Sequence, residues 1–162
     1  HTIRKNSNLL LQLVNELLDI RKFEANDIHL KITKGDFVSY CKEIYLSFSE
    51  IASDRNIEYT FDSEQPKIEL WFDKNQLEKV LYNLLTNAFK FTKNGGAINI
   101  EIETDNEAVY LIVKDTGIGI SEAHMSEIFN RFYQIKNIET DEKSGFGLGL
   151  SIAKEIIDLH KG

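Results

Sequence analysis

The sequence predicts an α+β fold preceded by one long helix, and three patterns carry this prediction. Apolar residues alternate over 98–102, the turn Asp105-Asn106 follows, and 108–114 can form a partner strand, which together indicate a β-hairpin. Between residues 73 and 91, apolar residues recur every three or four positions, as on one face of a helix. A heptad-like spacing over 3–24 indicates a further, longer helix.

The long helix has an apolar arc that is too wide for contact with a single neighbour. We therefore expect it to be one strut of a helical bundle, with the polar stretch 21–27 as a hinge. The alternative is a terminal helix that folds back on the chain's own core. The heptad-like positions are Ile3, Leu10, Leu13, Leu17 and Ile20.

Between this helix and the central one, short patterns alternate. Residues 28–32 predict a short strand that Gly35 ends, and Asp36 can cap a helix over 37–51. Residues 57–61 alternate as a strand, and 68–72 form a short extended piece.

The central helix begins with Asp73, and Gln76 three residues later resembles a capping box. Its predicted buried face is Leu77, Leu81, Leu84, Ala88 and Phe91. Residues 150–159 predict a final helix.

Composition excludes several classes of protein. The 162 residues carry a net charge of −7, so we expect no binding to nucleic acid or to an anionic membrane surface. The single cysteine, Cys41, cannot form an internal disulfide and fits a buried apolar position. No apolar run approaches the ~20 residues of a membrane span, and a cytosolic setting fits. The chain begins mid-pattern without a Met, so we expect a fragment.

A second stripe on the central helix consists of Asn83, Asn87 and Lys90. Asparagine is a poor residue for a helix interior because its amide competes with the backbone for hydrogen bonds. On this stretch alone, a solvated helix face is the favoured explanation. The other explanation is a site where amide oxygens bind a hard cation and the ammonium group meets phosphate.

Two glycine-containing segments are also candidates. Residues 115–120 follow a strand, and the Asp115 carboxylate could accept a hydrogen bond from a ligand amine, although such a segment is usually a turn. Residues 145–149 precede a helix and could present amides to phosphate, or could be a flexible loop with a helix cap. Their G-x-G-x-G spacing is not the dinucleotide fingerprint.

In chain order the motifs are N-x-x-x-N-A-x-K-F-T, D-x-G-x-G-I, I-F-x-R-F-Y and G-x-G-L-G-L-S-I. Together they resemble the N, G1, F and G2 boxes of the ATP-binding catalytic domain of sensor histidine kinases. The leading helix, with L-L-D-I-R-K-F-E, resembles the second helix of that family's dimerisation and phosphoacceptor domain, in hybrid two-component sensors in particular. The resemblance implies a Bergerat-type two-layer α/β sandwich with a mixed sheet. It assigns residues 1–26 to the bundle and 27–162 to the ATP-binding domain, without the usual C-terminal hairpin.

Site residues follow from this resemblance. It implies that Asn87 is the main Mg²⁺ ligand, that Asn83 lies close to the metal, and that Lys90 contacts phosphate, these three being catalytic. Phe91 would lie along the nucleotide, and Asp115 would bind the adenine amino group. Further nucleotide contacts would come from Gly117, Gly119, Ile120, Gly145, Gly147, Leu148 and Gly149.

The implied lid runs from residue 121 to residue 144. Phe129 and Phe132 would anchor it, and His124 would lie on its surface. Where Phe146 stands, the family often has Thr or Ser, so we expect no hydrogen bond from that side chain.

The implied function is transfer of the γ-phosphoryl group of Mg-ATP to a histidine. One alternative is an ATPase of the same fold, as in gyrase or MutL, but these have a Glu where Asn83 stands, and an amide cannot act as a general base. Another alternative is a non-catalytic dimerisation module. The resemblance also implies a homodimer through the leading helix, a response-regulator receiver domain as partner, and a cytoplasmic position in a membrane-anchored sensor.

The family's acceptor histidine is followed by an acidic residue. No histidine of this chain is, so we expect the fragment alone to be inactive in autophosphorylation. The four histidines are His1, His29, His124 and His160.

Overall fold

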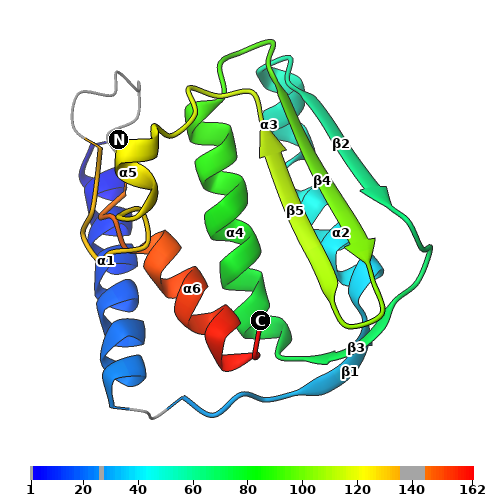
Figure 1. Cartoon of the computed structure of the whole chain (residues 1–162). Helices are drawn as coiled ribbons and strands as arrows, with labels where there is room; N and C mark the ends of the chain where they lie inside the picture. Colours follow the sequence, from blue (N-terminus) through cyan, green and yellow to red (C-terminus); the bar gives the residue numbers. More distant parts are fainter. Residues whose placement is uncertain (1, 26–27, 136–144) are drawn as a thin grey trace. The chain divides into compact units, whose positions relative to one another are not determined.

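The computed structural model describes residues 2–25, 28–135 and 145–162 (Figure 1). The chain forms two compact units, one spanning Lys31–Ile120 and the other joining His1–Leu30 to Ser121–Gly162. Helices and strands are both present, which confirms the predicted α+β class. The predicted division at residue 26 stays a prediction.

The unit Lys31–Ile120 contains a mixed three-stranded sheet in the order β2-β4-β5. Strand β2 is parallel to β4, and β4 is antiparallel to β5, so the predicted hairpin and the mixed sheet are confirmed. Strands β1 and β3 form a separate antiparallel pair. The elements are β1 (Thr33–Asp36), α2 (Phe37–Ser47), α3 (Ser49–Asp54), β2 (Glu58–Ser63), β3 (Glu69–Phe72), α4 (Lys74–Phe91), β4 (Ala97–Thr104) and β5 (Val109–Asp115).

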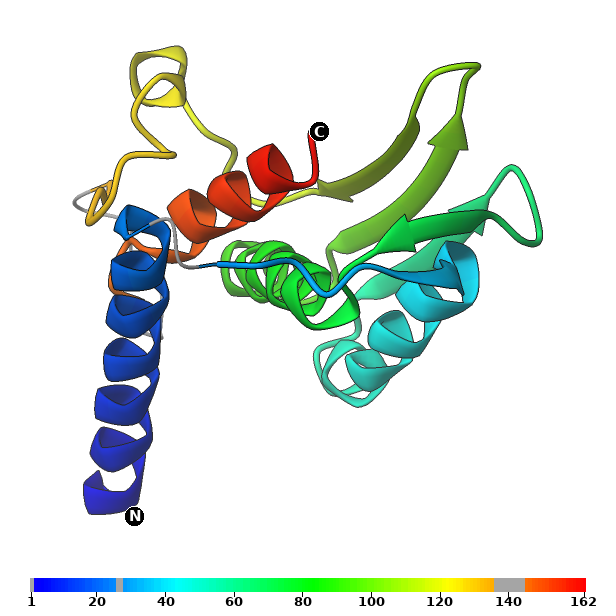
Figure 2. The ribbon, with the colours of Figure 1, turned by 90° about the horizontal axis from the view of Figure 1, so that it is seen from below.

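The core of this unit lies between the three-stranded sheet and helices α2, α3 and α4, which pack on one of its faces (Figures 1 and 2). Ile98, Ile100 and Ile102 of β4 are buried on that face, in register with the period of two that the sequence shows. Cys41 is buried among them, and burial raises the pKa of its thiol to about 12, which confirms the predicted apolar role.

Two aspartates begin the helices of this unit, as predicted. The Asp36 carboxylate accepts from the backbone N–H of Val38 at 3.2 Å and from the Ser39 hydroxyl at 2.5 Å, and this side-chain hydrogen bond lowers its pKa. Asp73 accepts from the N–H of Gln76 at 3.1 Å. The capping box is only half formed, because the buried Gln76 Oε1 has no hydrogen-bond partner among the residues that the structure describes.

Two predicted boundaries are wrong. The strand predicted over 28–32 is instead β1, and Gly35 lies inside it opposite Leu70. A side chain at Gly35 would meet Lys74 Cε at 3.2 Å, so this glycine allows close packing and does not end the strand. The helix predicted over 37–51 is interrupted at Phe48, whose buried ring stacks on Phe89 at a centroid distance of 5.4 Å.

The buried face of α4 is also rotated from the predicted one. Leu81 and Ala88 are buried as expected, whereas Leu84 and Phe91 are only half-buried. Phe89 replaces them in the core because its ring contacts both Phe48 and the sheet residue Tyr59. The buried residues of α4 are Val80, Leu81, Leu85, Ala88 and Phe89.

The other unit contains α1 (Thr2–Glu24), α5 (Glu122–Met125) and α6 (Gly149–Leu159), and α1 lies beside α6 (Figure 1). The first and last helices confirm the predicted elements. Leu10, Leu11 and Leu18 of α1 are exposed and Ile20 is buried, whereas the side chain of Ile3 and the hinge residues 26–27 lie outside the described residues. Within the described part of the chain, no helix is both long enough and apolar enough to cross a membrane.

Candidate functional site

The predicted polar stripe lies on the second half of α4. Asn83, Asn87 and Lys90 are all half-exposed, and none belongs to the core of the unit. The Lys90 ammonium lies 5.1 Å from the centre of the Phe91 ring, which is a cation–π distance. The helix therefore presents amide and ammonium groups at its surface, near its C-terminal end.

The predicted Asp115 loop begins where β5 ends. Asp115 Oδ1 accepts from the N–H of Gly117 at 2.8 Å, which forms a tight turn. The Thr116 N–H donates to Ala97 O at 3.0 Å, and the Ala97 N–H donates to Thr116 Oγ1 at 2.9 Å. The start of the loop is thus fixed to the first residue of β4. The rest of the loop is open, with Ile118 and Ile120 exposed.

Gly117 lies directly against the end of α4. A Cβ atom at this position would be 2.8 Å from the carbonyl oxygen of Phe91, so a side chain there would clash with backbone. This contact places the Asp115 loop next to the helix end that carries Asn87 and Lys90. Gly119 differs, because a Cβ there would meet nothing within 4 Å, but its φ of +69° favours glycine.

Two residues beside this region were missed by the sequence interpretation. Thr92 is 1% exposed, and its hydroxyl has no hydrogen-bond partner among the described residues. Its place in the N-x-x-x-N-A-x-K-F-T motif could have singled it out. Arg55 donates to Phe89 O and Thr92 O, both at 2.5 Å, and to Asn94 Oδ1 at 2.9 Å, which satisfies carbonyls at the C-terminal end of α4. No motif signals Arg55.

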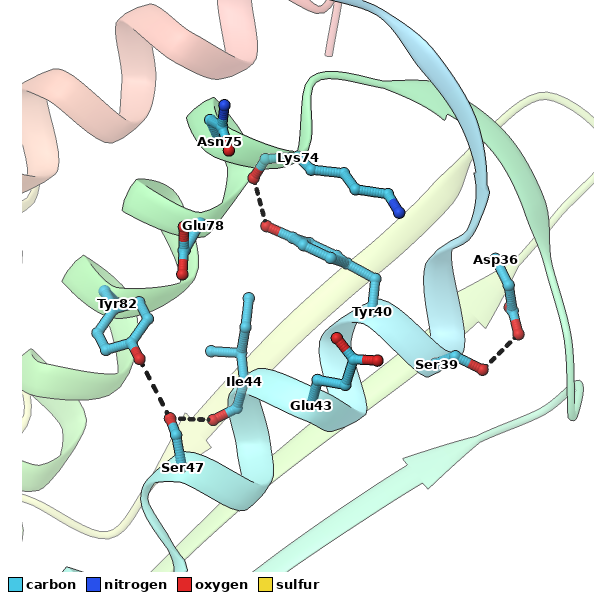
Figure 3. A pocket seen from close by; sticks show the side chains of 10 residues that line it. All are labelled: Asp36, Ser39, Tyr40, Glu43, Ile44, Ser47, Lys74, Asn75, Glu78 and Tyr82. Carbon is cyan, nitrogen blue, oxygen red and sulfur yellow. Dashed lines mark hydrogen bonds between the residues drawn. The ribbon is translucent and has the colours of Figure 1, made fainter.

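A separate cavity of about 450 Å³ lies between α2 and the first half of α4 (Figure 3). The Tyr40 hydroxyl donates to Lys74 O at 2.6 Å across it, and burial, followed by the Glu78 charge, raises the Tyr40 pKa. The Glu43 and Glu78 carboxylates both line this cavity. None of the predicted site residues does, so the cavity is distinct from the polar stripe.

In the other unit, the predicted glycine loop contacts the segment that follows α5. The N–H of Phe132 donates to Gly147 O at 2.8 Å, and Gln134 Nε2 donates to Gly145 O at 2.8 Å. A Cβ at Gly147, whose φ is +72°, would lie 2.6 Å from Tyr133 O. Leu148 is fully buried and precedes α6, which begins at Gly149.

The predicted lid is described only up to residue 135, and 136–144 lie outside the described residues. The rings of Phe129 and Phe132, expected to anchor it, are exposed, and the hydrogen bonds to the glycine loop come instead from the Phe132 backbone N–H and the Gln134 side chain. His124 is half-buried, with Nδ1 2.6 Å from the Tyr133 hydroxyl. Desolvation, followed by the Glu127 hydrogen bond and charge, raises the Tyr133 pKa.

The family model and the relatives that match this sequence indicate the same family. Residues 72–162 match the family described as histidine kinase-, DNA gyrase B- and HSP90-like ATPase. The chain is 45% identical over 163 residues to histidine kinase P4 of Formosa agariphila and 38% identical over 162 residues to the sensor histidine kinase TmoS of Ectopseudomonas mendocina. Both alignments cover 99% of the chain, which spans 12% and 16% of these two proteins.

Solved structures show the same fold. Full-length ShkA in complex with AMPPNP gives a TM-score of 0.82 at 27% identity, covering 96% of this chain and 32% of ShkA. Histidine kinase ThkA in complex with the response regulator TrrA gives 0.72 at 25% identity, covering all of this chain and 46% of that one. The chain therefore belongs to the histidine kinase-, DNA gyrase B- and HSP90-like ATPase family, and sensor histidine kinases are its relatives.

Proposed function

We propose that the chain binds Mg-ATP and that its parent protein transfers the γ-phosphoryl group to a histidine. The observation that carries this proposal is the packing of Gly117 on the carbonyl of Phe91. It unites, within one compact unit, a carboxylate suited to adenine and a helix that presents amide and ammonium groups. The AMPPNP complex of ShkA supports a nucleotide as the ligand class.

The donor set fits Mg²⁺ bound together with phosphate. Among the described residues, no three His, Cys, Asp or Glu side chains gather into a metal site. Amide oxygens from Asn87 and Asn83 are ligands of the hard type that Mg²⁺ accepts, and Mg²⁺ commonly keeps waters and substrate phosphates as its other ligands. When bound, the metal offsets phosphate charge, and Lys90 adds a point charge beside it.

The remaining predicted contacts fit a nucleotide in different ways. Gly117 packs on the Phe91 carbonyl, whereas a Cβ at Gly119 would meet nothing within 4 Å, so the main chain near Asp115 has space for a flat base at Gly119. We assign Phe91, Gly119 and Ile120 to the same region. The assignment of phosphate contacts to the amides of Gly145, Gly147, Leu148 and Gly149 rests on the sequence resemblance alone.

The second candidate function is ATP hydrolysis, as in other members of this ATPase family. Asn83 argues against it, because an amide cannot take a proton from water. We therefore expect turnover of Mg-ATP by this chain to stay near background. Brisk hydrolysis by the wild-type protein would support the ATPase function. Its persistence in Asn83→Ala would show that residue 83 does not determine the rate of turnover.

Partners and location are proposed at the level of the parent protein. The exposed leucines of α1 support dimerisation through that helix, and the ThkA–TrrA complex supports a response-regulator receiver domain as partner. A hybrid architecture and a cytoplasmic position in a membrane-anchored sensor rest on the sequence resemblance alone.

Calorimetric titration with ATP, in excess Mg²⁺ and in EDTA, tests the proposal. Wild-type protein should bind ATP more tightly with Mg²⁺. Asn87→Ala removes a metal ligand, so the Mg²⁺ enhancement should fall by about 1–3 kcal/mol with the fold intact. Asn75→Ala, the same substitution in the first turn of α4, should leave it unchanged. An unchanged Mg²⁺ dependence in Asn87→Ala would contradict the metal site and favour the explanation that the Asn83–Lys90 stripe is a solvated helix face.

A further inference from the structure

Arg131 lies in the segment that follows α5 and connects this segment to α1 and to α6, all within one compact unit. Its guanidinium contacts Glu24 Oε1 in the last turn of α1 at 2.5 Å and Glu155 Oε1 of α6 at 3.4 Å. A planar guanidinium can donate to two carboxylates at once, which an ammonium group does less well. Arg131 lies in the I-F-x-R-F-Y motif, but the proposed function gives it no role.

The backbone next to Arg131 is fixed to the glycine loop. The N–H of Phe132 donates to Gly147 O, and the side chain of Gln134 donates to Gly145 O. Phe132 has a φ of +63°, an uncommon conformation for a residue with a side chain, which persists only when its neighbours enforce it. A displacement of the glycine loop must therefore move the segment that carries Arg131.

From these contacts we propose that Arg131 is a positioning residue that couples the glycine loop to the last turn of α1. A change at Gly145 or Gly147 reaches Arg131 through the Phe132 and Gln134 hydrogen bonds, and reaches α1 through Glu24. Glu155 holds the same guanidinium against α6, so that its orientation is fixed from two sides. The ligand that would produce such a change is the nucleotide of the proposed function, on which this part of the inference rests.

The coupling is expected to be modest. Side chains of Arg131 and Glu24 are 32% and 49% exposed, and ion pairs in water are weak at such exposure. The loss of such a pair should change a local opening equilibrium roughly two- to fivefold. A link of this size can respond to a ligand and does not lock the unit in one state.

Hydrogen exchange without nucleotide tests the link itself. Two reporter amides are the Phe132 N–H, bonded to Gly147 O, and the Ala25 N–H, bonded to Arg21 O at 3.0 Å. Arg131→Met and Glu24→Gln should both raise the exchange rate of Ala25 roughly two- to fivefold, and the double variant should add little. Lys22→Met, which removes a positive charge from the same helix turn, is the control and should leave both amides unchanged.

An unchanged Ala25 rate in Arg131→Met, or fully additive effects in the double variant, would overturn the link. Addition of Mg-AMPPNP then tests transmission. In wild-type protein it should alter Ala25 exchange, whereas Arg131→Met should still bind the nucleotide by calorimetry without a response at Ala25. Binding with no response in wild-type protein would overturn the coupling. If wild-type protein binds no nucleotide, the proposed function fails, and the exchange data without nucleotide still decide whether Arg131 links the two segments.

Discussion

Replacement of Gly117 by alanine tests the contact on which the proposed site depends. The new Cβ would lie 2.8 Å from Phe91 O, 3.0 Å from Phe91 C and 2.7 Å from Asp115 Oδ1. The carboxylate can rotate away, but the Phe91 carbonyl belongs to the end of α4 and cannot. Either the clash remains, at the ~1–3 kcal/mol typical of overpacking, or the loop moves away from the helix.

The two possibilities differ in where the cost appears, so two assays are needed. Urea denaturation would detect a retained clash, and calorimetry with Mg-ATP would detect a displaced loop as a loss of affinity of roughly tenfold or more, about 1.4 kcal/mol. Gly95→Ala is the matched control, because Gly95 has a φ of +79° and open space around it. It should cost about 1 kcal/mol of stability and no ATP affinity. Wild-type stability together with wild-type affinity in Gly117→Ala would refute the reasoning.

Two further predictions concern stability. Arg55→Met removes charged hydrogen bonds to Phe89 O and Thr92 O, so the free energy of unfolding in urea should fall by about 1.5–3 kcal/mol. The stability of Arg55→Lys should lie between those of wild-type protein and Arg55→Met. A Met variant as stable as wild type would contradict this role. Burial raises the pKa of Cys41 from 9.0 to about 12, so stability present below pH 9 should decline as the pH rises above 9, at up to about 1.4 kcal/mol per pH unit. Cys41→Ala should clearly reduce this slope between pH 9 and pH 10, where Tyr40 and Tyr59, whose pKa values burial also raises, contribute less than they do at higher pH. An equal slope in both proteins would assign it to other groups.

Local chemistry explains what could be predicted of the fold. Asp36 and Asp73 predict helix starts because their carboxylates cap the first turn of the helix that follows. Apolar residues alternate at Ile98, Ile100 and Ile102 because one face of β4 is buried. Strand β1 was not predicted because its first two residues are exposed, its last two are only half-buried, and it pairs with β3 more than thirty residues away. Its sequence, Thr-Lys-Gly-Asp, lacks the alternation of apolar and polar residues that marks a strand with one buried face.

Rotation of the buried face of α4 could not be predicted for a similar reason. Leu84 and Leu85 are equally apolar, and only the packing of Phe89 on Phe48 and Tyr59 decides which of them is buried. The same applies to the site. Spacing predicted the Asn83–Lys90 stripe, but the approach of Gly117 to Phe91 O joins segments distant in sequence. The capping of α4 by Arg55 is equally nonlocal.

The most direct test of the proposed nucleotide site compares ATP with GTP. Asp115→Asn keeps an oxygen that can accept from the Gly117 N–H, so the turn should survive while the negative charge is lost. Wild-type protein should prefer ATP, because guanine has a carbonyl where adenine has its amine, and Asp115→Asn should lose about 1.5–3 kcal/mol of ATP binding, measured by calorimetry. Equal affinities of wild-type protein for Mg-ATP and Mg-GTP, with no loss in Asp115→Asn, would contradict the assignment of Asp115 to adenine.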